Sequence, residues 1–223
     1  MKTNAELQID VMDAIKWEPS LNAAEIGVTV KDGIVTLTGT VDNYGKKSEA
    51  EEAAKNVVGV KAVVEKIEIN SGTWGVTSDG DIAKEILSAY KWNFQVPNNT
   101  VKVKVENGWV TLEGELNWNF QRDAAKDAVS HLNGVKGVSN KLTIKSESRD
   151  SIEQKDIENA LNRNWSIMDE DINVKVSGSC VSLSGTVGSW YQKDEAARIA
   201  WNAPGVEMVE NNLVIEYDYA SMD

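Results

Sequence analysis

Residues 30–39 read Val30-Lys31-Asp32-Gly33-Ile34-Val35-Thr36-Leu37-Thr38-Gly39, and the same pattern returns twice without gaps. The second copy reads Val105-Glu106-Asn107-Gly108-Trp109-Val110-Thr111-Leu112-Glu113-Gly114. The third copy reads Val176-Ser177-Gly178-Ser179-Cys180-Val181-Ser182-Leu183-Ser184-Gly185. Such internal similarity is typical of a repeated structural unit. We therefore predict three units, over residues 1–72, 73–147 and 148–223, with short linkers near residues 71–75 and 146–149.

Each copy of the pattern predicts a β-hairpin. Apolar and polar residues alternate on both sides of the turn, as they do in strands that are covered on one face only. The central pairs Asp32-Gly33, Asn107-Gly108 and Gly178-Ser179 are residue types that tolerate positive φ in a two-residue turn.

Helical patterns lie on both sides of the hairpin. In the first unit, apolar residues recur at helical spacing over residues 7–15, and small residues do so over residues 50–57. A third apolar strand over residues 63–69 closes the unit, and the other two units repeat this order. A strand followed by a helix and another strand, as at the end of each unit, is expected to form a crossover connection. The predicted fold class is α+β: three tandem α-β-β-α-β units, each a three-stranded mixed sheet with two helices on one face.

Eight glycines recur at matching places and are predicted to be structural. Gly33 and Gly108 belong to the hairpin turns, and Gly59, Gly134 and Gly205 stop the second helix of each unit. Gly39, Gly114 and Gly185 end the second strand, where a side chain would obstruct either a bend or the helix that crosses above.

The charge of the chain argues against nucleic acid as a partner. The formal net charge is −12, whereas non-specific binding to phosphates needs clustered lysine and arginine. This charge is unevenly distributed: residues 1–72 carry −4, residues 73–145 carry +1 and residues 146–223 carry −9. The middle unit is therefore the least repelled by an anionic surface.

We expect no catalytic site, no metal centre and no cofactor. The one histidine, His131, has no nucleophile near it at a recognisable spacing, and we interpret it as a solvated helix residue. The one cysteine, Cys180, is interpreted as a small strand residue. The acidic run Asp169-Glu170-Asp171 lacks the spacing of a calcium loop, which favours a solvated loop.

The repeated order of amphipathic helix, Val-x-Val, Asp/Asn-Gly turn, Val-Thr-Leu-x-Gly, alanine-rich helix and Gly-Val resembles the BON domain, named for bacterial osmotic-stress and nodulation proteins. The resemblance covers residues 4–69, 79–144 and 150–215; the third unit departs from it at its Gly178-Ser179 turn. Members are bacterial, often osmotically induced and frequently exported, and the domain is thought to attach to phospholipid membranes. One relative binds potassium. The resemblance thus implies a non-enzymatic, stress-associated module that binds phospholipid membrane surfaces peripherally. The alternatives are a soluble binder that responds to potassium and a protein interaction scaffold.

The eight tryptophans have two competing explanations. Trp17, Trp92 and Trp165 fall where the first helix of each unit ends, and Trp118 and Trp190 precede the second helix. Such side chains can be buried against a neighbouring unit, which small domains need, or they can enter the headgroup layer of a membrane. We favour packing between units for most of them, although the two roles can share residues.

For membrane attachment the middle unit is the best candidate. We expect its lipid-binding residues to be four lysines and four aromatic residues: Lys84, Lys91, Lys102, Lys104, Trp92, Phe94, Trp118 and Phe120. The predicted partner is an anionic phospholipid surface or an envelope protein. The N-terminus lacks the apolar stretch of a secretory signal, which predicts the cytoplasm; the periplasm is the alternative if the native N-terminus has been removed.

Overall fold

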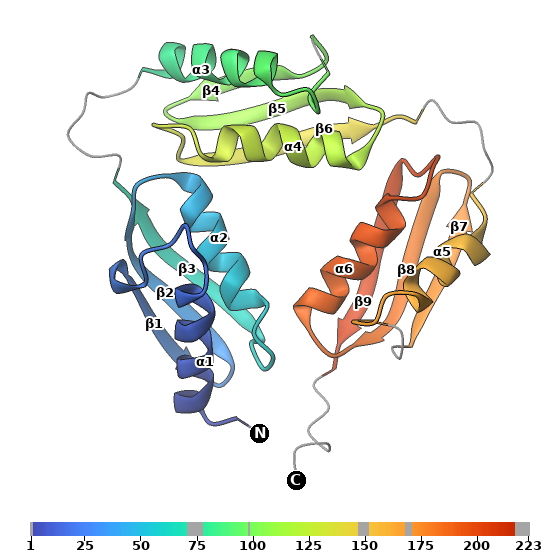
Figure 1. Ribbon diagram of the computed structural model, residues 1–223, viewed down its shortest axis with the longest axis horizontal. Coiled ribbons are helices and arrows are strands. Elements are labelled where there is room, and N and C mark those ends of the chain that lie inside the picture. Colours follow the sequence, from blue (N-terminus) through green and yellow to red (C-terminus); the bar gives the residue numbers. More distant parts are fainter. Residues whose placement is uncertain (1, 71–77, 98, 147–151, 168–170, 217–223) are drawn as a thin grey trace. The chain divides into compact units, whose positions relative to one another are not determined.

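The computed structural model describes residues 2–70, 78–97, 99–146, 152–167 and 171–216, and it contains three units that each have a sheet and two helices of their own (Figure 1). The predicted linker residues 71–75 and 147–149, and Asp169 and Glu170 of the acidic run, lie outside the described residues. The α+β fold class and the three α-β-β-α-β units are confirmed.

The elements follow the same order in each unit. Unit 1 contains α1 (Asn4–Lys16), the short 3-10 helix η1 (Ala23–Glu25), β1 (Ile26–Lys31), β2 (Ile34–Val41), α2 (Tyr44–Lys55) and β3 (Ala62–Ile69). Unit 2 contains α3 (Asp79–Trp92), β4 (Lys102–Glu106), β5 (Trp109–Leu116), α4 (Asn119–Ser130) and β6 (Gly137–Ile144). Unit 3 contains α5 (Gln154–Asn162), β7 (Ile172–Ser177), β8 (Cys180–Val187), α6 (Trp190–Trp201) and β9 (Met208–Ile215).

The second strand is the centre of every sheet. The orders are β1-β2-β3, β4-β5-β6 and β7-β8-β9. The hairpin partners are antiparallel, whereas β3 runs parallel to β2 and β9 runs parallel to β8. A parallel neighbour cannot follow through a tight turn, so the second helix carries the chain back across the sheet. Both helices of a unit lie on the same face of its sheet (Figure 1).

Alternation along the central strand places one set of side chains against these helices. Val35 and Leu37 of β2 are fully buried, as are Val110 and Leu112 of β5, and Val181 and Leu183 of β8. The residues between them, such as Thr36, are on the other face and are only partly covered. Period-two patterning therefore fixes which face of each sheet is the core.

The glycine at the end of the central strand is required by a close backbone approach. Gly114 has φ +144°, and a Cβ there would overlap the backbone oxygen of Thr100, just before β4. Gly185 is equivalent: its φ is +121°, and a Cβ would overlap the backbone oxygen of Asp171. The obstruction is thus the backbone at the entrance to the neighbouring strand, and this was neither of the two causes that we expected.

The hairpin turns differ between the units. Asn107 and Gly108 both have positive φ, +54° and +82°, and Asp32 and Gly33 match them, which is the pattern of a type I′ turn. In unit 3 only Gly178 has positive φ, +60°, and a glycine in this first central position is typical of a type II′ turn. Both types suit the right-handed twist of the strands, so the sequence departure in unit 3 leaves the hairpin intact.

Candidate functional site

The two most exposed apolar side chains of unit 2, Trp92 and Phe94, lie at the end of the unit where α3 stops and α4 starts. We call Trp92, Phe94, Trp118 and Phe120 the aromatic end. Their exposed fractions are 82%, 96%, 38% and 49%. The strand register explains their proximity: Lys102 pairs with Glu113, so the entrance to β4, which follows α3, lies beside the exit of β5, which precedes α4.

Two buried residues fix the segment that displays Trp92, the last residue of α3, and Phe94. Tyr90 is 8% exposed, and its hydroxyl donates a hydrogen bond to the backbone oxygen of Ala125 at 3.0 Å, which ties the end of α3 to α4. Val96 is 4% exposed and returns the chain to the core. Between these two anchors, the side-chain oxygen of Asn93 accepts from the backbone N–H of Gln95 at 3.0 Å. The loop is held at both ends while its two aromatic rings remain in solvent.

Burial changes the chemistry of Tyr90 as well as its position. Desolvation raises the pKa of this phenol, because the interior disfavours the phenolate. The hydroxyl therefore remains a neutral hydrogen-bond donor to Ala125 at all physiological pH values.

The structure separates the four lysines of the predicted lipid-binding set. Lys91 is exposed in the last turn of α3, next to Trp92, and Lys102 is exposed at the start of β4. Lys84 belongs to the first half of α3, and its ammonium is 3.1 Å from the carboxylate of Asp81. Lys104 is further along β4, 3.0 Å from the carboxylate of Glu106. Only Lys91 and Lys102 therefore lie at the aromatic end.

The alternation of β4 also assigns its lysines to a face. Val103 and Val105 are the partly buried residues of this strand, whereas Lys102, Lys104 and Glu106 are exposed on the opposite face. That face of the sheet carries no helix (Figure 1). Lys102 can still reach the aromatic end, because it is the first residue of the strand; Lys104 cannot contribute to the same surface as directly.

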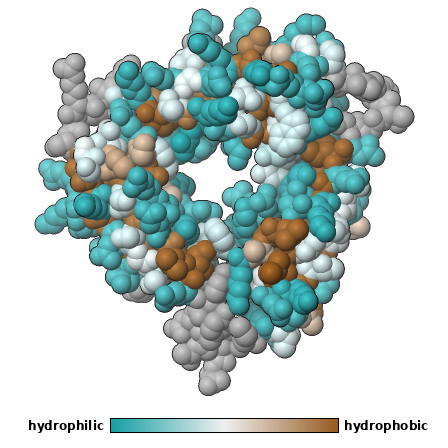
Figure 2. Space-filling view, turned by 180° about the vertical axis from the view of Figure 1, so that it is seen from behind, coloured by the Kyte–Doolittle hydropathy of each residue, from teal (hydrophilic) through white to brown (hydrophobic). Residues whose placement is uncertain are grey.

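The other two units also expose a tryptophan at this end of the fold. Trp17 is the C-cap residue of α1 and is 84% exposed, and Trp165, two residues beyond the C-cap of α5, is also 84% exposed. The face of the molecule drawn in Figure 2 is largely hydrophilic and carries separate hydrophobic patches. All three units therefore present an exposed tryptophan ring near the end of their first helix.

Other candidate chemistry is sparse in the part of the chain that is described. No group of three His, Cys, Asp or Glu side chains there could hold a metal ion. His131 lies just past α4, exposed, with its Nδ1 3.2 Å from the backbone oxygen of Asp127. No described helix is both long enough and apolar enough to cross a bilayer.

One surface feature of unit 3 could not be predicted from the sequence. A groove runs between α5 and α6 of unit 3, lined by Arg163, Trp165 and Tyr191 among others. Trp165 was noted as an aromatic residue at a helix end, but Arg163 carried no signal, because a surface arginine has no characteristic neighbours in the sequence.

Comparison with known proteins agrees with this architecture. The family model of the BON domain matches residues 3–71, 78–146 and 149–217. Osmotically-inducible protein Y of Escherichia coli K12 is 32% identical over 139 residues, which are 60% of this chain and 69% of that protein. The outer membrane lipoprotein DolP of Haemophilus influenzae is 29% identical over 135 residues, which are 59% of this chain and 69% of that protein.

Among solved structures, the C-terminal domain of CdsD, a structural protein of the type III secretion system of Chlamydia trachomatis, is similar at 18% identity. The match covers 96% of this chain and all of that one, with a TM-score of 0.26. The repeats, the sheet order and the three family matches agree: the chain belongs to the BON domain family.

Proposed function

We propose that this chain is a non-enzymatic, stress-associated protein of the bacterial envelope that attaches peripherally to anionic phospholipid membranes. Its BON units and its similarity to an osmotically inducible protein and to an outer membrane lipoprotein support this proposal. The N-terminus alone predicted the cytoplasm; the outer membrane lipoprotein among the relatives favours the envelope instead.

The observation that carries the proposal is the aromatic end of unit 2. Phe94 and Trp92 are almost fully exposed on an anchored loop, and Phe120 is half exposed beside it. Tryptophan is favourable at the headgroup level of a bilayer, and phenylalanine gains free energy when its ring leaves water. The anchored loop matters because a pre-ordered surface loses little conformational entropy on binding.

Electrostatics would make this attachment weak and reversible. Lys91 and Lys102 form no ion pair with other described residues, so both are available to anionic headgroups. Each basic residue near such a surface contributes about 1 kcal/mol, so the two together give about 2 kcal/mol. The net charge of −12 opposes contact, although charges farther from the membrane than a Debye length, about 8 Å at physiological salt, are largely screened. Added salt also screens the attraction between the two lysines and the anionic headgroups. Binding should therefore decrease steeply as salt is added.

The test is co-sedimentation of the full chain with vesicles of phosphatidylglycerol and phosphatidylcholine, or of phosphatidylcholine alone, at low and high salt. We expect recovery with the anionic vesicles at low salt. The double variant Trp92→Ser with Phe94→Ser should lose most of it. Trp17→Ser is the matched control, because Trp17 is equally exposed at the same place in unit 1, which carries a net charge of −4. No recovery with either kind of vesicle would refute the proposal.

Charge reversal tests the electrostatic part separately. Lys91→Glu should reduce recovery with anionic vesicles, whereas Lys155→Glu, on the exposed surface of α5 in unit 3, should change it little. An equal loss in both variants would mean that total charge, and not the aromatic end, governs the contact.

A further inference from the structure

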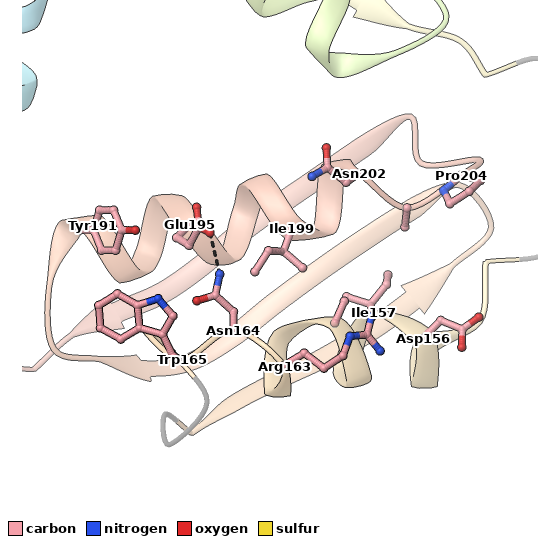
Figure 3. A pocket seen from close by; sticks show the side chains of 12 residues that line it. Asp156, Ile157, Arg163, Asn164, Trp165, Tyr191, Glu195, Ile199, Asn202 and Pro204 are labelled. Atoms are coloured by element: carbon pink, nitrogen blue, oxygen red, sulfur yellow. Dashed lines mark hydrogen bonds between the residues drawn. The ribbon is translucent and has the colours of Figure 1, made fainter.

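Unit 3 contains an open groove between α5 and α6 with a volume of about 550 Å³ (Figure 3). This volume is within the range of small-molecule sites. Its apolar floor is formed by Ile157 and Ala160 of α5 together with Ile199 and Ala203, from α6 and the residues just after it.

Two aromatic rings stand at one end of this groove. Trp165 is 84% exposed and Tyr191 is 44% exposed; they come from the loop after α5 and from the start of α6, and Figure 3 shows them close together. Flat rings that remain in water beside a groove offer stacking surfaces to a ligand.

The wall next to these rings is fixed by hydrogen bonds. The side-chain amide of Asn164 donates to Glu195 at 2.7 Å, and its oxygen accepts from the backbone N–H of Ser166 at 3.0 Å. Arg198 donates twice to the same Glu195 carboxylate, at 2.6 and 2.7 Å. Glu195 is thus already neutralised and serves to hold α5 and the Trp165 loop against α6.

Three polar side chains of the lining remain free for a ligand. Asp156, Arg163 and Asn202 line the groove, and none of their side chains has a hydrogen bond or ion pair to another described residue. Together they offer a carboxylate acceptor, guanidinium donors and an amide that does both.

These groups narrow the chemistry of the ligand. An anionic lipid surface is disfavoured, because residues 146–223 carry a net charge of −9. A basic peptide would meet the free guanidinium of Arg163 inside the groove. What fits is an uncharged molecule with flat apolar faces for the rings and hydroxyls for the mixed donors and acceptors. We propose that the α5–α6 groove of unit 3 binds a neutral saccharide, with its C–H faces on Trp165 and Tyr191 and its hydroxyls on Asp156, Arg163 and Asn202.

Unit 2 provides an internal control. At the aligned offset of 71 residues, Arg163 corresponds to Trp92 and Glu195 to Ala124. The equivalent helix pair therefore lacks both the free guanidinium and the carboxylate that fixes the wall. A saccharide site of this kind is specific to unit 3.

The test is a titration of the full ¹⁵N-labelled chain with neutral oligosaccharides, namely chitopentaose, cellopentaose and maltopentaose, followed by NMR and calorimetry. We expect at least one of them to shift amides of α5 and α6 saturably, with a Kd of about 1 mM or below. Trp165→Ser should weaken this binding about tenfold, because a stacked aromatic ring contributes about that factor. Its ring is outside the core, so the fold is retained, and the dispersion of the spectrum checks this.

Trp92→Ser in unit 2 should leave saccharide binding unchanged. The proposal is overturned if none of the three oligosaccharides binds at about ten times that concentration, or if Trp165→Ser binds as well as the parent. It is also overturned if a lysine-rich amphipathic peptide shifts the groove amides while the oligosaccharides do not. None of these results bears on vesicle binding by unit 2, so the two proposals fail independently.

Discussion

Units 2 and 3 build the same sheet from the same buried positions, yet they hold their helices and turns by different means. Val110 and Leu112 of unit 2, and Val181 and Leu183 of unit 3, are all fully buried on the central strand. The end of α3 is tied to α4 by the Tyr90 hydroxyl, whereas α5 and its loop are tied to α6 through the Asn164, Glu195 and Arg198 network.

The hairpin turns of the two units are also held by different polar groups. In unit 2 the carboxylate of Asp79, the first residue of α3, accepts from the turn N–H groups of Asn107 at 2.8 Å and Gly108 at 2.9 Å. In unit 3 the turn residue Ser179 donates instead to Glu207, at 2.9 Å. Apolar and glycine positions are therefore fixed by the fold, while polar ties are interchangeable. The surfaces can consequently diverge, to a net charge of +1 in residues 73–145 and −9 in residues 146–223.

The shared part of the comparison predicts the largest effect. Gly114→Ala and Gly185→Ala should each destabilise their own unit by about 3 kcal/mol, because each forces a Cβ onto a backbone oxygen at positive φ. Amide hydrogen exchange of the two sheets measures each unit separately. Gly178→Ala is the control: φ is +60° with open space around the Cβ, so only the left-handed backbone cost of about 1 kcal/mol remains.

The turn ties should respond unequally. Asp79→Ala removes two charge-assisted hydrogen bonds and should destabilise unit 2 by about 1–2 kcal/mol. The hydrogen-exchange rate should increase most at the amides of Asn107 and Gly108. Asp79→Asn should cost less, since Asn4 holds the turn of unit 1 in this way by accepting from the backbone N–H of Asp32 at 2.9 Å. If Asp79→Ala leaves those exchange rates unchanged, this tie contributes nothing to stability.

The Tyr90 hydroxyl that ties α3 to α4 in unit 2 can be removed, as in unit 3, which has Leu161 at the position of Tyr90. Tyr90→Phe deletes only the hydroxyl and should destabilise unit 2 by about 1 kcal/mol, the usual net value of one hydrogen bond. Urea unfolding followed at the β5 amides measures it. A null result would show that packing of the ring alone holds α3 to α4.

The smallest effect is the pH dependence that Glu195 contributes to unit 3. Hydrogen bonds from Arg198, together with its charge, hold the pKa of Glu195 below its ordinary value, and Asn164 adds to this. Since the folded pKa is the lower one, the contribution to stability is present above the unfolded pKa and is lost as the pH falls through the folded value. A carboxyl ¹³C titration should show the low pKa, and Arg198→Gln should raise it. Unit 2 has Ala124 at the position of Glu195 and therefore lacks this contribution.

Much of the fold was accessible from the sequence, because apolar periodicity and Asp/Asn-Gly turns are local signals. The hairpins around Gly33 and Gly108, the order of the elements and the family resemblance are all confirmed. The sequence could not show that Asp79 would cap a turn 28 residues away. Nor could it show that Lys84 would pair with Asp81, away from the aromatic end, while Lys91 stays beside it. A hydrogen-bond partner can be distant in the sequence, and several charged neighbours can compete for one lysine. Only the packing of the folded chain decides which of these pairs form.

By itself, the sequence determined the three copies, the burial of alternate strand positions and the places where only glycine fits, because these follow from periodicity and backbone sterics. The tertiary structure alone decided which of the exposed groups share a surface. It brought Lys102 and Phe120 to the end of unit 2 that carries Trp92 and Phe94, and it brought Tyr191 of α6 to the groove lined by Arg163 and Trp165 in unit 3. The physical reason is that a binding surface depends on how helix ends and strand ends meet in space, and that meeting is fixed by long-range packing of the core, which no local pattern records.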